Sequence, residues 1–233
     1  MKKILFVASI LLGVFLIYLS TLDKKVYYLS VGDELSVGYN IYNQKDYGYT
    51  DYIKDYLDKK HILEVYANAY FNEDLRAIDL IRKIEDNEKI KVNGKVRTIK
   101  NALIKADLVT LSIGSNDILN KMTLYENFTK EEMYNYIDEF LKDLDNLFKL
   151  VRKYCKEDIM FIGYYNVINN KNVDKYYKYL NEKAKELTIK YKIEYVDIYD
   201  FVFVEDNALY PNKNEYIKIG EKIVGLIEKK ILD

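Results

Sequence analysis

Three short polar segments hold the residue types that could do chemistry, and each follows or precedes an apolar stretch. These segments are Asp33-Glu34, Asn116-Asp117, and Asn207 with Tyr210. A carboxylate surrounded by amide and phenol groups can bind sugar hydroxyls, an amine or a cation. A solvated carboxylate with no ligand is the simpler interpretation of Glu34, and the residue types alone leave both open.

Serine catalysis would need a base within hydrogen-bond reach of the hydroxyl. Ser36 and Ser115 stand beside two of the polar segments, but the chain contains one histidine, His61. His61 follows Lys59-Lys60 at the start of a predicted strand, so it lies at the opposite end of that strand from the polar segments. We therefore interpret His61 as a solvated surface residue and expect no Ser-His pair.

Carboxylates alone support two other kinds of site. Asp33 and Glu34 could form the acid pair of a glycosidase, and together with Asp117 they could bind a hard cation. Adjacent residues in a tight loop usually point apart, however, and the spacing of the three acids matches no known cation-binding loop. We expect no metal ion and no other cofactor.

The elements that would position these residues alternate along the chain. Predicted strands cover residues 26–31, 62–70, 107–113, 159–164 and 193–199, and predicted helices cover 50–59, 73–85, 129–154, 174–190 and 212–230. Asn93-Gly94 marks a small hairpin or extended turn over 89–99. This alternation predicts a parallel sheet with helices on both faces. Right-handed crossovers would then bring the loops that follow the strands to one edge.

Composition excludes several classes of protein. The 233 residues include 36 Lys and Arg against 37 Asp and Glu, a net charge of −1, so we expect no nucleic-acid partner. The single cysteine, Cys155, excludes an intramolecular disulfide framework, and we expect it to be buried. A hydrophobic content of 49% with 31% charged residues is typical of a folded globular chain.

The amino-terminal residues carry a membrane signal. No charged residue occurs from Ile4 to Leu22, and Lys2-Lys3 precede this run. Its length is close to the ~20 apolar residues that span a bilayer. We therefore predict a signal-anchor over residues 1–25 and one domain over 26–233 outside the cytoplasm. Cleavage of the segment as a secretion signal is the alternative.

The polar segments, in their order, resemble a known family. They read Gly32-Asp33-Glu34-Leu35, Gly114-Ser115-Asn116-Asp117, and Asn207 to Pro211. Together they resemble the SGNH/GDSL hydrolases, over about residues 26–231. The resemblance implies a flavodoxin-like three-layer α/β/α sandwich with a five-stranded parallel sheet. For active members it implies hydrolysis of ester or acyl bonds, and many exported bacterial members act on acylated cell-wall sugars or lipids.

The same resemblance assigns roles to positions in this chain. The family's serine nucleophile, its histidine base and its aspartate correspond to Glu34, Tyr210 and Asn207. Its oxyanion hole uses the serine N–H, a glycine in the loop after the second strand, and an asparagine. Asn116 matches that asparagine, whereas the loop over 68–73 contains no glycine, so we expect the loop's oxyanion donor to be missing. The predicted ligand-binding residues are Asp33, Glu34, Asn72, Asn116 and Tyr210.

These changes exclude Ser-His-Asp hydrolysis, because loss of a triad member costs several orders of magnitude in rate. We expect a pseudo-hydrolase that binds a cell-envelope glycan, an acyl ligand or a protein partner. An esterase or acyl hydrolase with altered chemistry is the alternative. A pocket that is open beside Glu34 favours ligand binding, and a filled pocket favours interaction with a protein.

Overall fold

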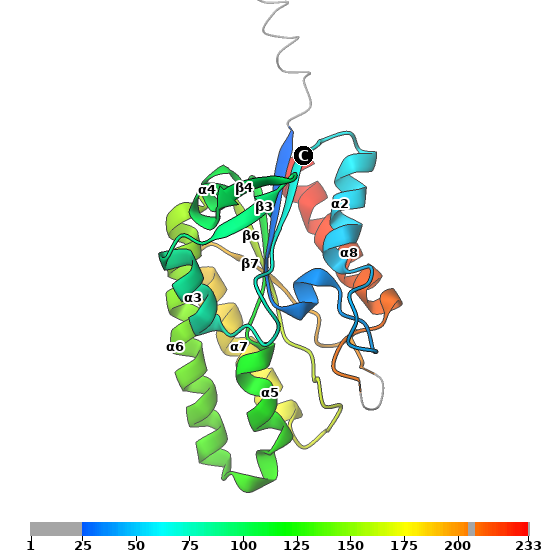
Figure 1. The fold of residues 1–233 in the computed structure, drawn as a ribbon. Helices are drawn as coiled ribbons and strands as arrows, with labels where there is room; N and C mark the ends of the chain where they lie inside the picture. The colour runs from blue at the N-terminus through cyan, green and yellow to red at the C-terminus, as the bar shows by residue number, and fades with distance from the viewer. Residues whose placement is uncertain (1–24, 205–207, 233) are drawn as a thin grey trace, which may run out of the picture.

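The computed structural model describes residues 25–204 and 208–232. Its centre is a twisted sheet in the order β4-β3-β2-β1-β5-β6-β7 (Figure 1). The strands are β1 (Val26–Gly32), β2 (Leu63–Ala69), β3 (Lys89–Val92), β4 (Lys95–Thr98), β5 (Leu108–Ser112), β6 (Asp158–Ile162) and β7 (Glu194–Val196). The five strands β2-β1-β5-β6-β7 are parallel, in the flavodoxin-like order predicted from the sequence.

The sheet is larger than predicted, because the hairpin of β3 and β4 joins it as an antiparallel extension beyond β2. The cause lies in β3, where Ile90 and Val92 are buried while Lys89 and Lys91 are exposed. Such alternation requires one covered face. Pairing of Val92 with Ala67 of β2 adds β3 to the sheet, and Ile90 and Val92 then face the larger core while the two lysines face solvent.

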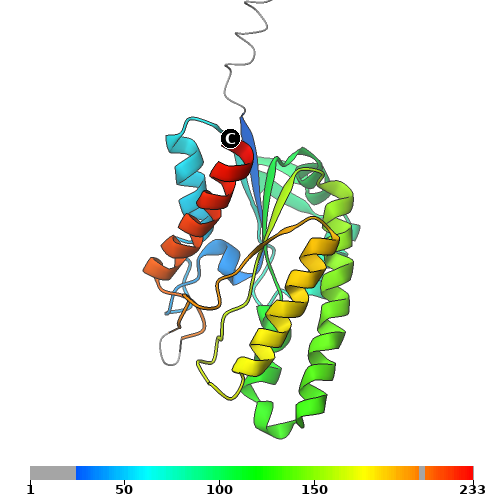
Figure 2. The ribbon, with the colours of Figure 1, turned by 180° about the vertical axis from the view of Figure 1, so that it is seen from behind.

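Helices cover both faces of the sheet, as Figures 1 and 2 show from opposite sides. On one face lie α2 (Tyr49–Lys59) and α8 (Lys213–Ile227); on the other lie α3 (Ala77–Glu85), α4 (Ile99–Lys105), α6 (Lys130–Tyr154) and α7 (Asp174–Lys190). The short α5 (Ser115–Thr123) follows β5. Neither α4 nor α5 was predicted, and α3 begins at Ala77 rather than at residue 73, because residues 73–76 form part of the site described below.

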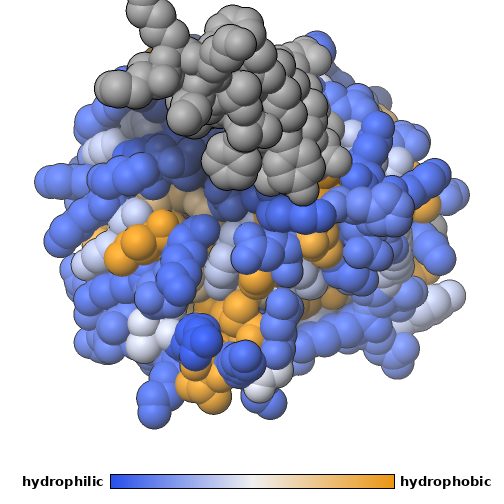
Figure 3. All heavy atoms as spheres, turned by 90° about the horizontal axis from the view of Figure 1, so that it is seen from above, coloured by the Kyte–Doolittle hydropathy of each residue, from blue (hydrophilic) through white to orange (hydrophobic). Residues whose placement is uncertain are grey.

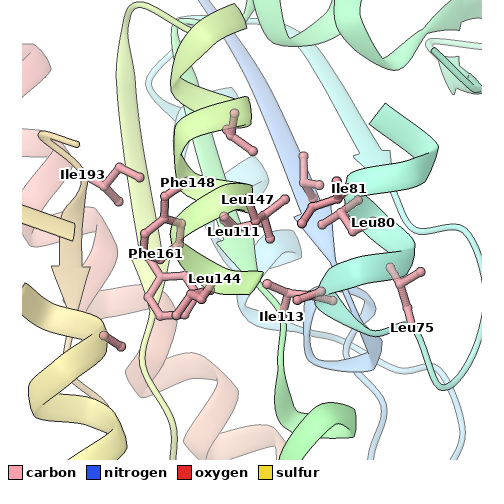
Figure 4. Packing of buried hydrophobic residues seen from close by; sticks show 14 of the residues in the cluster. Leu75, Leu80, Ile81, Leu111, Ile113, Leu144, Leu147, Phe148, Phe161 and Ile193 are labelled. Carbon is pink, nitrogen blue, oxygen red and sulfur yellow. The ribbon is translucent and has the colours of Figure 1, made fainter. Parts of the chain in front are cut away.

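The larger core lies between the sheet and α3, α6 and α7 (Figure 4). Every residue of β5 is buried, as expected for a central parallel strand. From α6, Leu144, Leu147 and Phe148 point to this core, and the Phe148 ring packs edge-on against Phe161 of β6. Cys155, at the end of α6, is buried as predicted, and burial raises the pKa of its thiol to about 11.

The two ends of the parallel strands define two edges of the sheet. The amino edge holds the starts of the parallel strands, and Lys25 and the end of α8 also lie there (Figure 1). The carboxyl edge holds the loops that follow the strands, and the predicted site residues belong to it. The predicted membrane segment lies outside the described residues except for Lys25. Within residues 25–204 and 208–232, no helix is long and apolar enough to cross a membrane.

Candidate functional site

The site begins where β1 ends. Asp33 N–H donates to the Ser112 carbonyl of β5 at 2.9 Å, and the Asp33 carboxylate accepts the Leu35 N–H at 3.2 Å. Asp33 thereby caps the short 3-10 helix η1 (Glu34–Val37). This turn places Glu34 at the carboxyl edge, at the position that a nucleophilic serine occupies in the family that the sequence resembles.

The Glu34 carboxylate is fully engaged inside the protein. The side chain is buried, with 3% of its surface exposed. Its Oε1 accepts the Asp74 backbone N–H at 2.7 Å, and its Oε2 accepts the Asn116 side-chain amide at 2.9 Å. The same Asn116 nitrogen also donates to the Leu75 carbonyl at 3.2 Å. One carboxylate therefore joins the loops that follow β1, β2 and β5.

The loop after β2 supplies a backbone donor despite its lack of glycine, which corrects the sequence prediction. Asp74 adopts a left-handed conformation with φ of +56°, which aspartate tolerates better than most residues. In this conformation its N–H points to Glu34. Asn72, which we predicted to bind ligand, is exposed, and its amide donates to the neighbouring Glu73 carbonyl. Asp74, and not Asn72, is therefore the residue of this loop that binds Glu34.

Tyr210 lies beside Glu34, as predicted. Its ring packs edge-on against Tyr39 with centroids 5.4 Å apart, and both Tyr210 and Glu34 line one small pocket. Burial, and next the charge of Glu34, raise the pKa of the Tyr210 phenol. The phenol therefore keeps its proton at neutral pH and cannot serve as a general base. Asn207, the predicted equivalent of the family's aspartate, lies outside the described residues.

The pocket beside Glu34 is nearly filled. Its volume is about 20 Å³, and its lining includes Asp33, Glu34, Asn116, Tyr165 and Tyr210. A volume of this size holds about one water molecule. The buried Tyr165 donates its hydroxyl to the Leu209 carbonyl at 2.9 Å and so ties the loop that carries Tyr210 to the loop after β6.

The two adjacent carboxylates serve different partners and do not form an acid pair for glycoside hydrolysis. Asp33 binds within η1, whereas Glu34 binds the loops after β2 and β5. Burial, and next the charge of Glu34, raise the pKa of Asp33 well above its usual range. Its Oδ2 is buried without a hydrogen-bond partner among the described residues. Asp33 is thus a buried structural acid of the turn.

Two serines and the one histidine are the remaining candidate residues. Ser36 is buried and donates its hydroxyl to the Asp33 carbonyl at 2.7 Å, so the hydroxyl is not free to attack a substrate. Ser115 begins α5 and is half-buried at the rim of the small pocket. His61 is exposed just before β2, at the amino edge, which confirms the expectation of a surface histidine far from the site.

Asp117 binds the start of a neighbouring helix. Its Oδ2 accepts the Ala77 N–H at 3.0 Å, the first residue of α3, and Tyr136 of α6 donates its hydroxyl to the Asp117 carbonyl at 2.6 Å. Burial raises the pKa of this carboxyl to about 7, although the Ala77 N–H opposes the rise. Among the described residues, no three acidic, histidine or cysteine side chains gather closely enough to hold a metal ion.

Asp117 should make stability depend on pH. Its pKa is about 7 when folded, against its ordinary value of 3.8, so between these values the folded protein binds the extra proton. Stability from this group is therefore fully present below pH 3.8 and is lost as pH rises to 7. Between pH 5 and 8 we expect the free energy of unfolding to fall by ~1–3 kcal/mol more in the native chain than in Asp117→Asn. Urea unfolding at several pH values measures this, and equal slopes would contradict it.

Several residues of the site were not predicted from the sequence. Besides Asp74, these include Tyr39, which donates its hydroxyl to Glu73 at 2.6 Å and receives the Tyr216 hydroxyl at its carbonyl at 2.8 Å. The turn-forming character of the stretch ending at Asp74 was the signal available for that residue. Tyr39 offered no comparable signal, because tyrosine is abundant throughout the chain.

The fold and the site together define a class of protein. A flavodoxin-like sheet carries a carboxyl edge where a backbone N–H and an asparagine amide converge on one negatively charged group, which is the donor arrangement of an oxyanion hole. Residues 28–212 match the family described as GDSL-like lipase/acylhydrolase. The chain belongs to this family.

Solved structures of esterases and lipases have the same fold. A lipase from a goat rumen metagenome superposes with a TM-score of 0.69 at 18% identity and covers 85% of this chain and 95% of its own. The acetylxylan esterase Axe2 from Geobacillus stearothermophilus gives 0.64 at 14% identity, over 88% and 95% of the two chains. The esterase EstA from a Pseudoalteromonas species gives 0.59 at 15%, over 88% and 98%. No curated protein sequence matches the chain.

Proposed function

We propose that this chain is a non-hydrolytic member of the GDSL family that works by binding a protein partner of the cell envelope. The observation that carries the proposal is the buried Glu34 carboxylate, bound by the Asp74 N–H and the Asn116 amide. The group that occupies the catalytic position thus also occupies the donors that hydrolysis would need.

Ester hydrolysis through an acyl-enzyme needs a nucleophile, a base and free donors for the oxyanion. Glu34 replaces the nucleophile, and its negative charge would repel the oxyanion of a tetrahedral intermediate at close range. Tyr210 stands at the position of the base but keeps its proton at neutral pH. Both side-chain and backbone donors are already bound to Glu34. None of the three requirements is met by the described residues.

The small volume of the pocket favours a partner that binds the outer surface of the domain. About 20 Å³ is far below the ~300 Å³ of ordinary ligand pockets, so a sugar or an acyl chain would have to displace Glu34 or Tyr210. The loops around Glu34 form instead a firmly joined surface, which suits the recognition of a protein. The filled pocket therefore favours a protein partner over the glycan and acyl ligands that the sequence left open.

We place the domain outside the cytoplasm, held to the cell membrane by residues 1–25. Support comes from the uncharged run between Ile4 and Leu22 and the two lysines before it. Under this proposal the carboxyl edge points away from the membrane, because β1 starts within a few residues of the anchor and runs away from it. A partner in the cell envelope would meet the loops around Glu34.

The test is hydrolysis of p-nitrophenyl acetate by the purified full chain in mild detergent. We expect no turnover above that of a boiled sample. Glu34→Ala is measured in parallel, because an esterase that uses Glu34 in altered chemistry would lose its activity in this variant. Turnover by the native chain that Glu34→Ala abolishes would establish the esterase alternative and overturn the proposal.

A further inference from the structure

Exposed basic side chains gather on one part of the amino edge. We call this surface the basic amino edge; its exposed members are Lys25, Lys59, Lys60, Lys95, Arg97 and Lys105. Lys25 precedes β1, Lys59-Lys60 end α2 before β2, and Lys105 ends α4 before β5. Within the described part of the chain, none of the six makes an ion pair with an acidic side chain. Their charge is therefore available to an external anion.

The hairpin of β3 and β4 extends this surface. β3 runs antiparallel to β2, so the turn at Asn93-Gly94 lies toward the amino edge (Figure 1). Arg97 of β4 lies opposite Ile90 of β3 in this hairpin. Burial raises the pKa of Tyr27 at the start of β1, and the positive charge of Arg97 opposes that rise. The hairpin and α4 hold basic residues at several positions and no acid, whereas Glu85, Asp86 and Glu88 precede them.

Two large apolar side chains stand exposed among these charges. Val96 in β4 is 57% exposed, and Ile104 in α4 is 61% exposed. Figure 3 looks down on the amino edge, where hydrophilic side chains cover most of the visible face and hydrophobic patches lie between them. Basic side chains with interspersed apolar ones are typical of a surface that rests on the headgroups of a membrane.

Acidic side chains are also present at the amino edge, and three of them bind partners within the domain. Glu194 pairs with Lys230 at 2.6 Å, and Asp107 accepts the Tyr27 N–H at 2.8 Å. Glu228 accepts the Tyr56 hydroxyl at 2.7 Å. Asp58, beside Lys59, is the exposed acid closest in sequence to the basic residues. Glu64 at the start of β2 and Glu157 just before β6 are also exposed there, and among the described residues neither makes an ion pair. The six basic residues of this surface therefore face three exposed acids, an excess of positive charge on this part of the edge.

The length of chain before β1 limits how far this surface can stand from a membrane. Only Asp23, Lys24 and Lys25 separate the uncharged run from Val26, the first residue of β1. Three extended residues span at most about 10 Å. Electrostatic attraction is screened over about 8 Å at physiological salt. If the run spans the bilayer, the basic amino edge must lie within reach of the headgroup charges.

We propose that the basic amino edge is a membrane-facing surface that binds the phosphate headgroups of anionic phospholipids, with Val96 and Ile104 at the lipid interface. This inference rests on the membrane anchor proposed above. Each lysine or arginine near an anionic surface contributes about a fivefold gain in binding. Contact with the lipid would hold the domain upright and direct the loops around Glu34 away from the membrane.

The experiment uses the full chain in lipid nanodiscs, with an environment-sensitive dye attached to the cysteine of the Val96→Cys variant. Cys155 is buried and should not react with the dye. Labelling of the native chain under the same conditions checks this. In discs of phosphatidylcholine with 30% phosphatidylglycerol, we expect a blue-shifted emission relative to phosphatidylcholine alone. The shift should vanish at 1 M salt. Neutralising Lys59, Lys60 and Lys105 to glutamine should weaken the contact about 100-fold and remove the shift. The matched control changes Lys171, Lys175 and Lys178, which lie in or just before α7 at the carboxyl edge, and should keep it.

The outcomes separate the two proposals. Co-elution of the chain with the discs after carbonate washing tests the anchor by itself. A chain that leaves the discs overturns the anchor and, with it, the lipid-facing surface. A chain that stays, but whose dye emits alike in both lipids, overturns the lipid-facing surface and leaves the anchor standing. A shift that the control triple variant also loses would assign the attraction to net charge and overturn the assignment to this edge.

Discussion

Replacing Glu34 with alanine should lower the free energy of unfolding by ~2–3 kcal/mol. The substitution removes a buried carboxylate and leaves the Asp74 N–H and the Asn116 amide without their acceptor. It also opens a cavity next to a pocket of about 20 Å³. The substitution also removes the repulsion between Glu34 and Asp33, which offsets part of the loss. The expected loss is therefore smaller than the ~3–5 kcal/mol that follows removal of one partner of a buried ion pair.

Urea or thermal unfolding of the full chain in detergent measures this effect. Glu221→Ala is the matched control, because Glu221 is exposed on α8, and its removal should change stability by less than ~0.5 kcal/mol. If Glu34→Ala proves as stable as Glu221→Ala, Glu34 does not join the three loops as described.

Gly32→Ala should have the largest effect of any single substitution discussed. A Cβ at this position would lie 1.9 Å from the Ser112 carbonyl oxygen, and Gly32 has a φ of +152°, in the region that favours glycine. Backbone atoms of β1 and β5 cannot separate without breaking their pairing, which continues to Gly32 and Ser112. We expect a loss of about 4 kcal/mol or more, which is close to the whole stability of a domain at the low end of the usual ~5–15 kcal/mol.

The yield of folded chain and its midpoint of thermal unfolding report the result. Gly225→Ala serves as the control, because no atom lies within 4 Å of a Cβ added at this position of α8. Alanine in a helix interior should raise stability there by ~0.5–1 kcal/mol. A Gly32→Ala chain that folds normally would mean that β1 and β5 approach less closely than described, and the turn that carries Glu34 would need another explanation.

Much of the fold was predictable because its signals are local. The central strands are continuous apolar runs, and α6 repeats its buried residues at helical spacing, so their positions follow from the chain itself. The hairpin was also visible from Asn93-Gly94. Its attachment to β2 was not, because pairing with Ala67 depends on a surface that exists only after the sheet has formed.

The sequence predicted which residues lie at the site better than it predicted the hydrogen bonds between them. Glu34, Asn116 and Tyr210 come together as the family resemblance implied. The contact between Glu34 and Asp74 spans 40 residues and uses a backbone N–H, which carries no residue type for a sequence motif to recognise. The prediction that the loop after β2 lacks a donor was wrong for this reason. A donor needs a suitable backbone conformation, and Asp74 attains it without glycine.

These contacts give the GDSL fold of this chain a specific interpretation. Donors of the kind that stabilise an oxyanion are present, and the Glu34 carboxylate accepts hydrogen bonds from both of them. Through these two contacts Glu34 joins the loops that follow β1, β2 and β5. The proposal of a binding function depends on this occupancy, and it can be examined apart from any partner.

Acetate rescue of Glu34→Ala tests the occupancy most directly. Alanine retains the Cβ of Glu34, so bound acetate would restore the missing methylene carbon and the carboxylate between the Asp74 N–H and the Asn116 amide. At 100 mM acetate we expect the variant to gain about 1 kcal/mol, as a dissociation constant of about 20 mM would give, relative to sodium chloride of equal ionic strength. The native chain and Glu221→Ala should gain nothing. If acetate stabilises Glu34→Ala no more than chloride does, these donors do not form an anion site, and the central claim is wrong.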